Sequence, residues 1–582
     1  MTKRINHIIL VVITLFVLPV IAQETKEEVR ETVTVVKSYN PEIEPSKKQA
    51  LIPKKTNFEK KTTANLKYRI GTFPVLDSHI PKFEAPYLHW ISPMEDVYSS
   101  LFKLTAGTNS SLNVNLSHHE YVSSRFNVGF RASYDTTKGA IEGYVYSPLN
   151  KNRYVGSTMG FSTKKGDGSL NASYQKQEFN YYGKQIWIGS PTSTKSTNQY
   201  YNRAAIDFEY HFNSGAIKNL SLNFNTISDL TKSDELDFKF ESETEFKLAD
   251  RLFRIDAFVD YLSGGFENAA LSLMDNSKPD PYKYTQLGLQ PQLDFSKDKL
   301  ELFVGIDLNY LSQNSSEEVG VSIYPLIDAQ YQLSNEVILK GGLNGYTQLN
   351  SFSNLTKQNP YLSPTLEMKP SYTLIDIDFG LEANSGKFLS LDLNTSASRV
   401  KNHPLIKLNH QNYFRNDEGP YLSETLNSFE VVYDQIDEVN ISGSLLVRPA
   451  EYLSLKTGIS YSKYRTLNEE VAWNLPNLKA YGSINAKLAK GWMLSSQLNF
   501  IGARKDREIT VVQFIMPGEY PGVTYDLEAF VNLNASLHYQ YSENWSFELK
   551  AENLTNNQYQ MWYNYPDLGA TITLGAQYRF DL

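Results

Sequence analysis

Histidines and carboxylates that could bind a metal occur at two places in the chain, and neither has the spacing of a metal site. His118, His119 and Glu120 are consecutive within a segment that we expect to be a strand. Successive strand residues point to opposite faces, so one ion could not readily use both histidines. The segment 275–280 offers oxygens suited to Ca²⁺ but lacks an EF-hand pattern and its fixed glycine. We predict a solvated loop there and no metal site.

The sequence also lacks familiar catalytic and nucleotide-binding motifs. It has no Gly-x-Ser-x-Gly elbow, no P-loop, no dinucleotide fingerprint and no His-Glu-x-x-His helix. It contains no cysteine, which excludes disulfides, thiol nucleophiles and a lipidated cysteine. The net charge of −8 argues against a nucleic-acid partner. We therefore predict that the chain is not an enzyme and has no cofactor.

Carboxylates recur at alternate positions that would share one face of the expected strands. Asp307, Asp376, Asp378 and Asp392 are examples, and cations on the same faces are fewer. If these faces line a water-filled lumen, the acidic wall would favour cations or neutral polar solutes over anions. The same wall could instead receive the lysine-rich N-terminal part of the chain as an internal filler.

Alternation with a period of two dominates the sequence from about residue 98 to the end. In the last such segment, 571–580, apolar side chains alternate with polar or small ones, and similar segments lie near 300, 389, 453 and 545. A helix cannot produce this pattern, because its faces repeat every 3.6 residues or so. Strict alternation suits strands with lipid on one side and water on the other.

The links between these segments predict the topology. Short links such as 165–168 and 384–387 alternate with generally longer ones such as 349–370 and 402–428. We predict an all-β fold, a transmembrane antiparallel β-barrel of about 22 strands with short periplasmic turns and long extracellular loops. The last strand would pair with the first, near Leu101, and both termini would be periplasmic. A soluble β-sandwich or propeller is the alternative, because its strands also alternate apolar and polar residues.

The N-terminal part divides into two segments ahead of a barrel at 98–582. Residues 1–22 have a charged start, an apolar stretch and small residues before Gln23, which is typical of a secretory signal peptide. Beyond it, no apolar run is long enough for a membrane helix. Residues 23–97 are rich in lysine and proline, so we expect an extended segment that lies in the periplasm or enters the lumen.

One patch of this segment is β-prone. It consists of Glu31, Thr32, Val33, Thr34, Val35 and Val36. The patch resembles the TonB box, the peptide through which TonB-dependent transporters join TonB by adding a strand to its sheet. A short strand that docks inside the protein or on another subunit is the other interpretation.

Three motifs follow one another at the end of the chain: Asn-Leu-Thr-Asn-Asn-Gln-Tyr at 553–559, Tyr-Pro-Asp-Leu-Gly at 565–569, and the aromatic last strand. This order resembles the close of a TonB-dependent receptor barrel. The last strand also resembles the C-terminal signal that the barrel-assembly machinery recognises, through Thr573, Gly575, Tyr578 and Phe580. Two residues follow the terminal phenylalanine, which is a small departure from the family.

A larger departure lies between residue 36 and the first strand, where the family normally carries a folded plug and this chain is too short for one. The resemblance therefore implies a plug-less barrel of the Bacteroidota type in the outer membrane of a Gram-negative cell. We expect it to serve uptake or passage of a polar solute. The alternative is a non-catalytic scaffold barrel with a filled pore in a multi-protein complex. Partners implied are outer-membrane lipid, the assembly machinery, TonB, and a surface lipoprotein or other subunits.

Aromatic residues in the links are expected to be exposed, where they could stack on sugars or pack on a surface lipoprotein. A place in the aromatic girdle of the membrane interface is the alternative for those near strands. They are Tyr181, Tyr182, Trp187, Tyr361, Tyr413, Phe414, Trp562 and Tyr563.

Overall fold

The computed structural model describes nine stretches of the chain. They are 98–144, 146–183, 198–248, 251–266, 281–313, 319–364, 366–409, 428–508 and 523–581. The expected signal peptide, the segment 23–97 with its patch at 31–36, and the loop 275–280 all lie outside the described residues.

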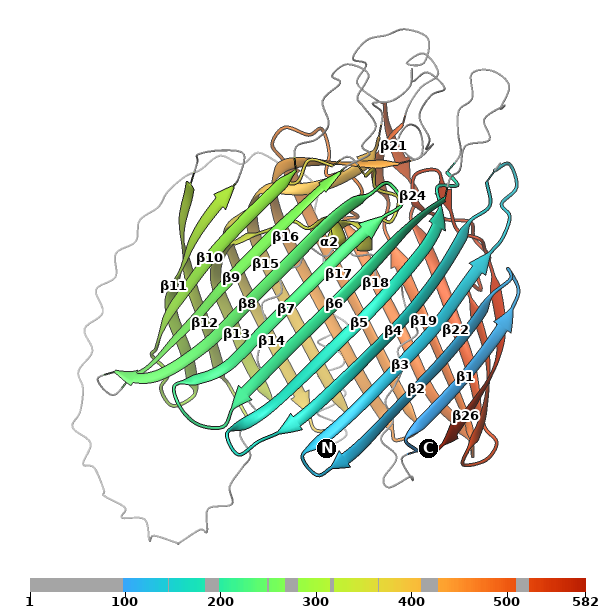
Figure 1. Ribbon diagram of the computed structural model, residues 1–582, viewed down its shortest axis with the longest axis horizontal. Coiled ribbons are helices and arrows are strands. Elements are labelled where there is room, and N and C mark those ends of the chain that lie inside the picture. Colours follow the sequence, from blue (N-terminus) through green and yellow to red (C-terminus); the bar gives the residue numbers. More distant parts are fainter. Residues whose placement is uncertain are drawn as a thin grey trace, which may run out of the picture. The chain divides into compact units, whose positions relative to one another are not determined.

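Twenty-two strands form one antiparallel sheet that closes on itself (Figure 1). Closure joins β1 (Ser100–Gly107) to β26 (Thr571–Phe580), with Leu101 opposite Arg579. Because the ring is closed, no strand of this sheet leaves an unpaired edge. The predicted all-β barrel of about 22 strands is confirmed, and so is the pairing of its last strand with its first.

The other strands of the barrel follow in chain order. They are β2 (Leu112–Ser123), β3 (Phe126–Lys138), β4 (Leu149–Ser162), β5 (Gly166–Asn180), β6 (Asn198–Phe212), β7 (Ile217–Asp229), β8 (Ser233–Leu248), β9 (Arg251–Phe266), β10 (Tyr282–Asp294), β11 (Leu300–Gln313), β12 (Val319–Gln332), β13 (Val337–Gln348), β14 (Ser371–Ser385), β15 (Leu389–Leu408), β16 (Phe429–Ala450), β17 (Leu453–Thr466), β18 (Leu478–Ala489), β19 (Trp492–Ile501), β22 (Phe530–Gln540) and β23 (Trp545–Glu552).

A few short elements lie in the links. The helix α2 (Phe352–Gln358) lies between β13 and β14, and β20 (Arg504–Glu508) pairs with β21 (Val523–Leu527) between β19 and β22. Two shorter strands, β24 (Gln560–Trp562) and β25 (Tyr565–Pro566), pair between β23 and β26. Among the described residues, no helix is long and apolar enough to cross a membrane.

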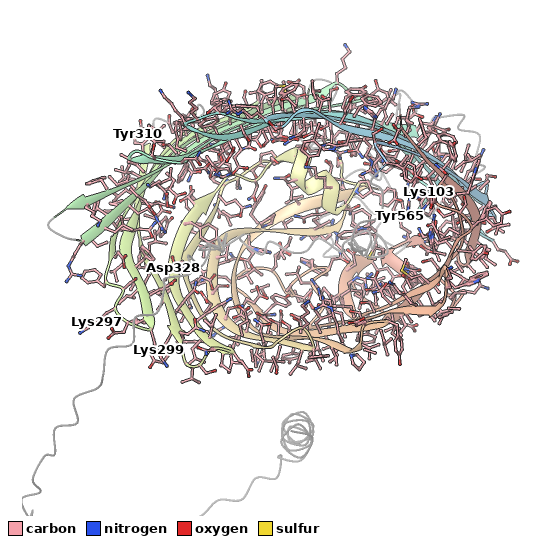
Figure 2. The ribbon with its side chains drawn as sticks, turned by 90° about the horizontal axis from the view of Figure 1, so that it is seen from below. Lys103, Lys297, Lys299, Tyr310, Asp328 and Tyr565 are labelled. Atoms are coloured by element: carbon pink, nitrogen blue, oxygen red, sulfur yellow. The ribbon has the colours of Figure 1, made fainter. Side chains whose placement is uncertain are left out.

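The two faces of the wall differ as the alternation predicts. On β11, Ile306 and Tyr310 are about two-fifths exposed, whereas Asp307 between them is buried. Tyr310 points away from the ring of strands and Asp328 points into it (Figure 2). Apolar side chains outside and polar ones inside are what a barrel needs when lipid surrounds it and water fills it.

The two ends of the barrel carry different links. We call the end where β1 begins and β26 finishes the terminal end, and it carries tight turns such as 163–165 and 386–388. The opposite end, the loop end, carries links such as 349–370 and 502–529. The predicted link at 402–428 is shorter than expected, because β15 continues to Leu408. A β-bulge between Val400 and His403 lets this strand bend and keep pairing with β16.

Candidate functional site

The four carboxylates named from the sequence lie on inward faces of the barrel wall. Asp307 on β11 is buried. Asp376 and Asp378 alternate along β14 with exposed apolar residues, which face outward. Asp392 on β15 is exposed and is paired across the sheet with Ser444. The structure places them on three different strands of the lumen wall and does not gather them into one site.

Ion pairs neutralise part of this wall. Arg254 contacts Glu245 at 2.9 Å and Glu243 at 3.6 Å. Lys340 contacts Glu382 at 2.6 Å. Along β8 to β14 the inward positions still hold more carboxylates than cations, so this part of the lumen is acidic. Such a wall attracts cations and repels anions.

Segments of the loop end fold into the barrel and form a layer that we call the cap. The cap comprises 349–370 with α2, 467–477, the hairpin of β20 and β21, and 553–570 with β24 and β25. Seen from the terminal end, α2 lies inside the ring of strands (Figure 2). The cap therefore lies across the loop end of the lumen.

Aromatic side chains bind the parts of the cap to one another and to the wall. Tyr361 stacks on Tyr565 with ring centroids 3.9 Å apart, and Tyr182 meets Tyr565 at 4.9 Å. Phe429, at the start of β16, meets Trp562 at 5.4 Å. Each such pair adds roughly 0.5–1.5 kcal/mol beyond the burial of its area. The cap thus has an apolar core of its own, built from segments far apart in the sequence.

Tyrosines at the loop end of the wall also hold the backbone of the cap. Their hydroxyls donate to backbone carbonyls that are buried or partly buried. The pairs are Tyr181 to Leu362 (2.9 Å), Tyr201 to Pro360 (2.9 Å), Tyr284 to Met368 (2.7 Å) and Tyr182 to Pro566 (2.9 Å). Burial raises the pKa of Tyr361, in the same cluster, to about 12, so its hydroxyl remains protonated near neutral pH.

The wall also fixes the start of α2. Ser351 is the N-cap, and its hydroxyl accepts from the backbone N–H of Asn354. The buried carboxylate of Glu235 on β8 accepts from the N–H groups of Phe352 at 2.6 Å and Ser353 at 2.9 Å. Tyr282 donates to the same carboxylate at 2.6 Å. The first turn of the helix is therefore tied to the barrel rather than to solvent.

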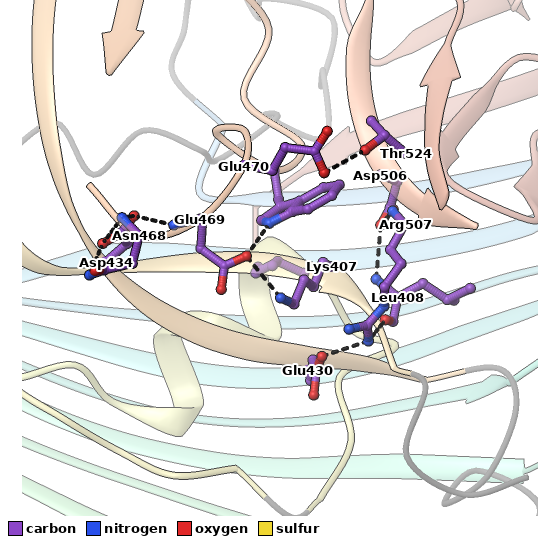
Figure 3. A network of polar contacts seen from close by, with 12 residues as sticks. Lys407, Leu408, Glu430, Asp434, Asn468, Glu469, Glu470, Asp506, Arg507 and Thr524 are labelled. Carbon is purple, nitrogen blue, oxygen red and sulfur yellow. Dashed lines mark hydrogen bonds and ion pairs between the residues drawn. The ribbon is translucent and has the colours of Figure 1, made fainter. Parts of the chain in front are cut away.

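A polar network joins 467–477 to the wall (Figure 3). The carboxylate of Glu469 accepts from Lys407 at 2.9 Å and from the indole N–H of Trp473 at 2.6 Å. Asp434 accepts from the backbone N–H groups of Asn468 and Glu469, at 2.9 Å and 2.8 Å. The bonds to Glu469 satisfy the buried donors of Lys407 and Trp473, which folding removes from water.

The hairpin of β20 and β21 carries buried charge. Asp506 is fully buried and accepts from the N–H of Leu408 and the amide of Asn474, both at 2.8 Å. Arg507 donates to the carbonyl of Leu408 and to Glu430, the latter at 2.6 Å. Burial raises the pKa of the Asp506 carboxyl to about 6, although its hydrogen bonds and Arg507 act in the opposite direction. The hairpin is thus anchored to β15 and β16.

Two of the three C-terminal motifs, 553–559 and 565–569, lie in the cap. Asn553 donates to Asp567 at 2.9 Å, which joins the first motif to the second. Tyr559 stacks on Phe530 with centroids 4.0 Å apart and accepts from Asn532 at 2.6 Å. These residues shape the link between β23 and β26.

The last strand places its signal-like residues on both faces. Thr573 and Gly575 alternate with Ile572 and Leu574, which are exposed on the outer face, and so lie on the inner face. Tyr578 and Phe580 follow on the outer face near the terminal end, with ring centroids 5.6 Å apart.

The prediction that the link aromatics are exposed is wrong for most of those described. Tyr181, Tyr182 and Trp562 are buried, and Tyr361 packs among them. Tyr563 is only partly exposed. Trp187, Tyr413 and Phe414 lie outside the described residues. Local sequence marks these segments as links but does not say whether they fold into the barrel or away from it.

The two neighbouring histidines are separated as expected for a strand. His118 lies 2.9 Å from the hydroxyl of Ser100, whereas His119 lies 3.3 Å from the amide oxygen of Asn127. In the part of the chain that the structure describes, no group of three or more histidine, aspartate or glutamate residues is arranged to hold a metal ion.

Comparisons with known proteins bear on the fold. No protein-family model and no curated protein sequence matches this chain. Among solved structures, the barrel resembles the FrpB iron transporter from Neisseria meningitidis, with a TM-score of 0.61 and 12% identity over 84% of this chain and 82% of that one. It also resembles the copper transporter OprC, with a TM-score of 0.59 and 12% identity over 83% of this chain and 80% of that one.

A third similar structure is the siderophore receptor PirA from Acinetobacter baumannii. Its TM-score is 0.59, with 10% identity over 84% of this chain and 81% of the other. At such low identity the likeness shows a shared fold alone.

Proposed function

We propose that this chain is an outer-membrane barrel of the TonB-dependent receptor type, through which a polar solute is taken up or passes. The observation that carries the proposal is the closed 22-strand sheet, apolar on its outer face and charged on its inner face. The similarity in fold to FrpB and OprC, which are named as iron and copper transporters, supports it. We place the terminal end in the periplasm and the loop end outside the cell.

The lumen wall favours a cationic or neutral polar cargo. Carboxylates outnumber cations along β8 to β14, and the ion pairs of Arg254 and Lys340 use only some of them. An anionic solute would meet repulsion along this wall.

A scaffold barrel with a filled pore is the second candidate, and the cap is the observation that favours it. Its aromatic core and its bonds to Glu235 and Asp434 hold a packed layer across the loop end. A barrel that only holds partners would gain from such rigidity, whereas a transporter has to move the layer.

Conductance and partner capture separate the two. The full-length protein would be inserted into planar bilayers, and the same protein would be isolated from its native membrane in mild detergent. A barrel that conducts and comes without stoichiometric partners would reject the scaffold. A barrel that stays closed and comes with stoichiometric partners would reject solute passage.

Energised transport in a plug-less barrel would require the patch at 31–36 to bind TonB. Strand addition uses backbone N–H groups, which proline lacks. We expect replacement of Val33 and Val35 by proline to abolish capture of the full-length protein by immobilised TonB. The matched control replaces Thr62 and Ala64 by proline and should leave capture unchanged. Equal capture by both variants would show that the patch is not a TonB box.

A further inference from the structure

Three cations share one carboxylate on the outer face of the barrel, close to its loop end. Glu178 on β5 lies 3.1 Å from Lys151 and 2.8 Å from Arg153 on β4, and 3.4 Å from Lys176 on its own strand. We call these four residues the basic cluster. One carboxylate neutralises one of the three positive charges, so the cluster carries a net positive charge.

The sheet register places two cations of the basic cluster directly opposite each other. Lys151 is directly opposite Glu178, but Arg153 is directly opposite Lys176. Like charges directly opposite on one face of an antiparallel pair are destabilising. Glu178 offsets part of this repulsion, and a further anion beside Arg153 and Lys176 would reduce it more.

The position of the cluster along the strands matches the level of lipid headgroups. The next cross-strand pair on the outer face, closer to the middle of the wall than Arg153 and Lys176, is Val155 opposite Tyr174. Both side chains are 47% exposed. β4 and β5 are neighbours in the wall (Figure 1). The outer face therefore changes from an apolar band to cations within one cross-strand pair, as expected at a membrane interface.

Aromatic and polar neighbours support this placement. The ammonium group of Lys176 lies 4.3 Å from the ring centroid of Tyr200 on β6, and the hydroxyl of Tyr174 donates to Asn202 at 3.1 Å. Tyrosines with an apolar ring and a wet hydroxyl are typical of the interface. Lys138, exposed at the end of β3, adds another cation at this end of the wall.

The same chemistry recurs elsewhere on the outer face. Asp437 on β16 accepts from Arg399 at 2.6 Å and is directly opposite Arg465 on β17. Again one carboxylate lies between two cations, and the exposed Val439 and Ile441 follow toward the middle of the wall. Excess positive charge at this level is therefore not confined to β4 and β5.

We propose that the basic cluster binds the phosphate of a membrane lipid in the leaflet at the loop end. Phosphate oxygens accept charge-assisted hydrogen bonds from lysine and arginine, and a phosphate beside Arg153 and Lys176 would relieve their repulsion. The acyl chains would then lie along the apolar band that begins at Val155 and Tyr174. The inference rests on the proposed residence of the barrel in a membrane and adds a specific lipid contact to it.

The test is lipid retention by the full-length protein in detergent, followed by native mass spectrometry. Phosphatidylglycerol and phosphatidylcholine with the same acyl chains are the two probes. We expect the wild type to retain phosphatidylglycerol over phosphatidylcholine by roughly tenfold or more, because each cation near the surface adds attraction for an anionic lipid. Replacing Lys151, Arg153 and Lys176 by glutamine should bring the ratio close to one.

A control with the same change in charge locates the effect. It replaces Lys164, Lys297 and Lys490, exposed at the terminal end, by glutamine and should keep the wild-type ratio. A second variant, Glu178→Gln, removes the competing carboxylate and should raise the ratio. It keeps all three cations, so it tests the proposal even if the triple variant assembles poorly.

Four results would overturn the lipid site: an equal ratio in the wild type, an unchanged ratio in the triple variant, an equal loss in the control, or a fall with Glu178→Gln. Displacement of phosphatidylglycerol by inorganic phosphate alone would also overturn it, because the cluster would then be a site for free anions. Failure of the wild type to retain either lipid is a different outcome, which would count against membrane residence and hence against the proposed function.

Discussion

Replacing Tyr565 with alanine should open the cap. The side chain is 2% exposed, stacks on Tyr361 at 3.9 Å, and meets the rings of Tyr182 at 4.9 Å and Phe429 at 5.8 Å. Removing a buried aromatic of this size costs about 3–5 kcal/mol. The loss falls on the cap, because the wall is held separately by its ladder of backbone hydrogen bonds. We expect the open fraction of the cap to rise by roughly a hundredfold or more.

Two measurements on the Tyr565→Ala variant follow the change. Hydrogen exchange in 351–364 and 555–568 should lose protection while the strands of the wall keep theirs. Ion conductance in planar bilayers should rise if solute passes through this lumen. The matched control, Tyr121→Ala, removes the same side chain from a site that is 72% exposed, and should change stability by less than about 0.5 kcal/mol.

The two measurements can also contradict the proposals separately. Unchanged protection would show that the aromatic core does not hold the cap in place. Lost protection without a rise in conductance would mean that something besides the cap obstructs the lumen. The scaffold would then be favoured over solute passage.

The barrel could be predicted from the sequence because the membrane imposes the same rule on every strand. Each strand has to show lipid an apolar face, so a period of two recurs through segments as distant as 300–313 and 571–580. Closure follows from the same rule, since an open edge in lipid would leave backbone groups unpaired. Leu101 and Arg579 meet for this reason, although they lie at opposite ends of the barrel sequence.

The cap could not be predicted in this way, because its contacts are made between links. Nothing near Tyr181 shows that Tyr361 and Tyr565 will pack beside it. The helix α2 is too short to give a clear period of 3.6 residues or so, and its one local signal is the N-cap at Ser351. The sequence shows that the motif around Asn553 resembles one in TonB-dependent receptors, but it does not show that Asn553 bonds to Asp567 in the cap.

The buried carboxyl of Asp506 should make the stability of the cap depend on pH. Its pKa is about 6 in the folded protein, against an ordinary value of 3.8, because burial disfavours the charged form. The folded state therefore binds this proton more tightly than the unfolded state does. The contribution is fully present below about pH 4 and is lost as the pH rises through about 6. A shift of this size corresponds to roughly 3 kcal/mol.

The variant Asp506→Asn isolates this contribution from other groups that titrate in the same range. Asparagine has nearly the same shape, keeps an oxygen that can accept from Leu408 or Asn474, and does not titrate. The quantity to measure is the opening free energy of the cap at about pH 4.5 and pH 7, from hydrogen exchange corrected for the intrinsic rate. We expect the opening free energy of the wild-type cap to be larger at about pH 4.5 than at pH 7, and this difference to be smaller in the variant. If the two proteins showed the same pH dependence, ionisation of Asp506 would not be what destabilises the cap at higher pH.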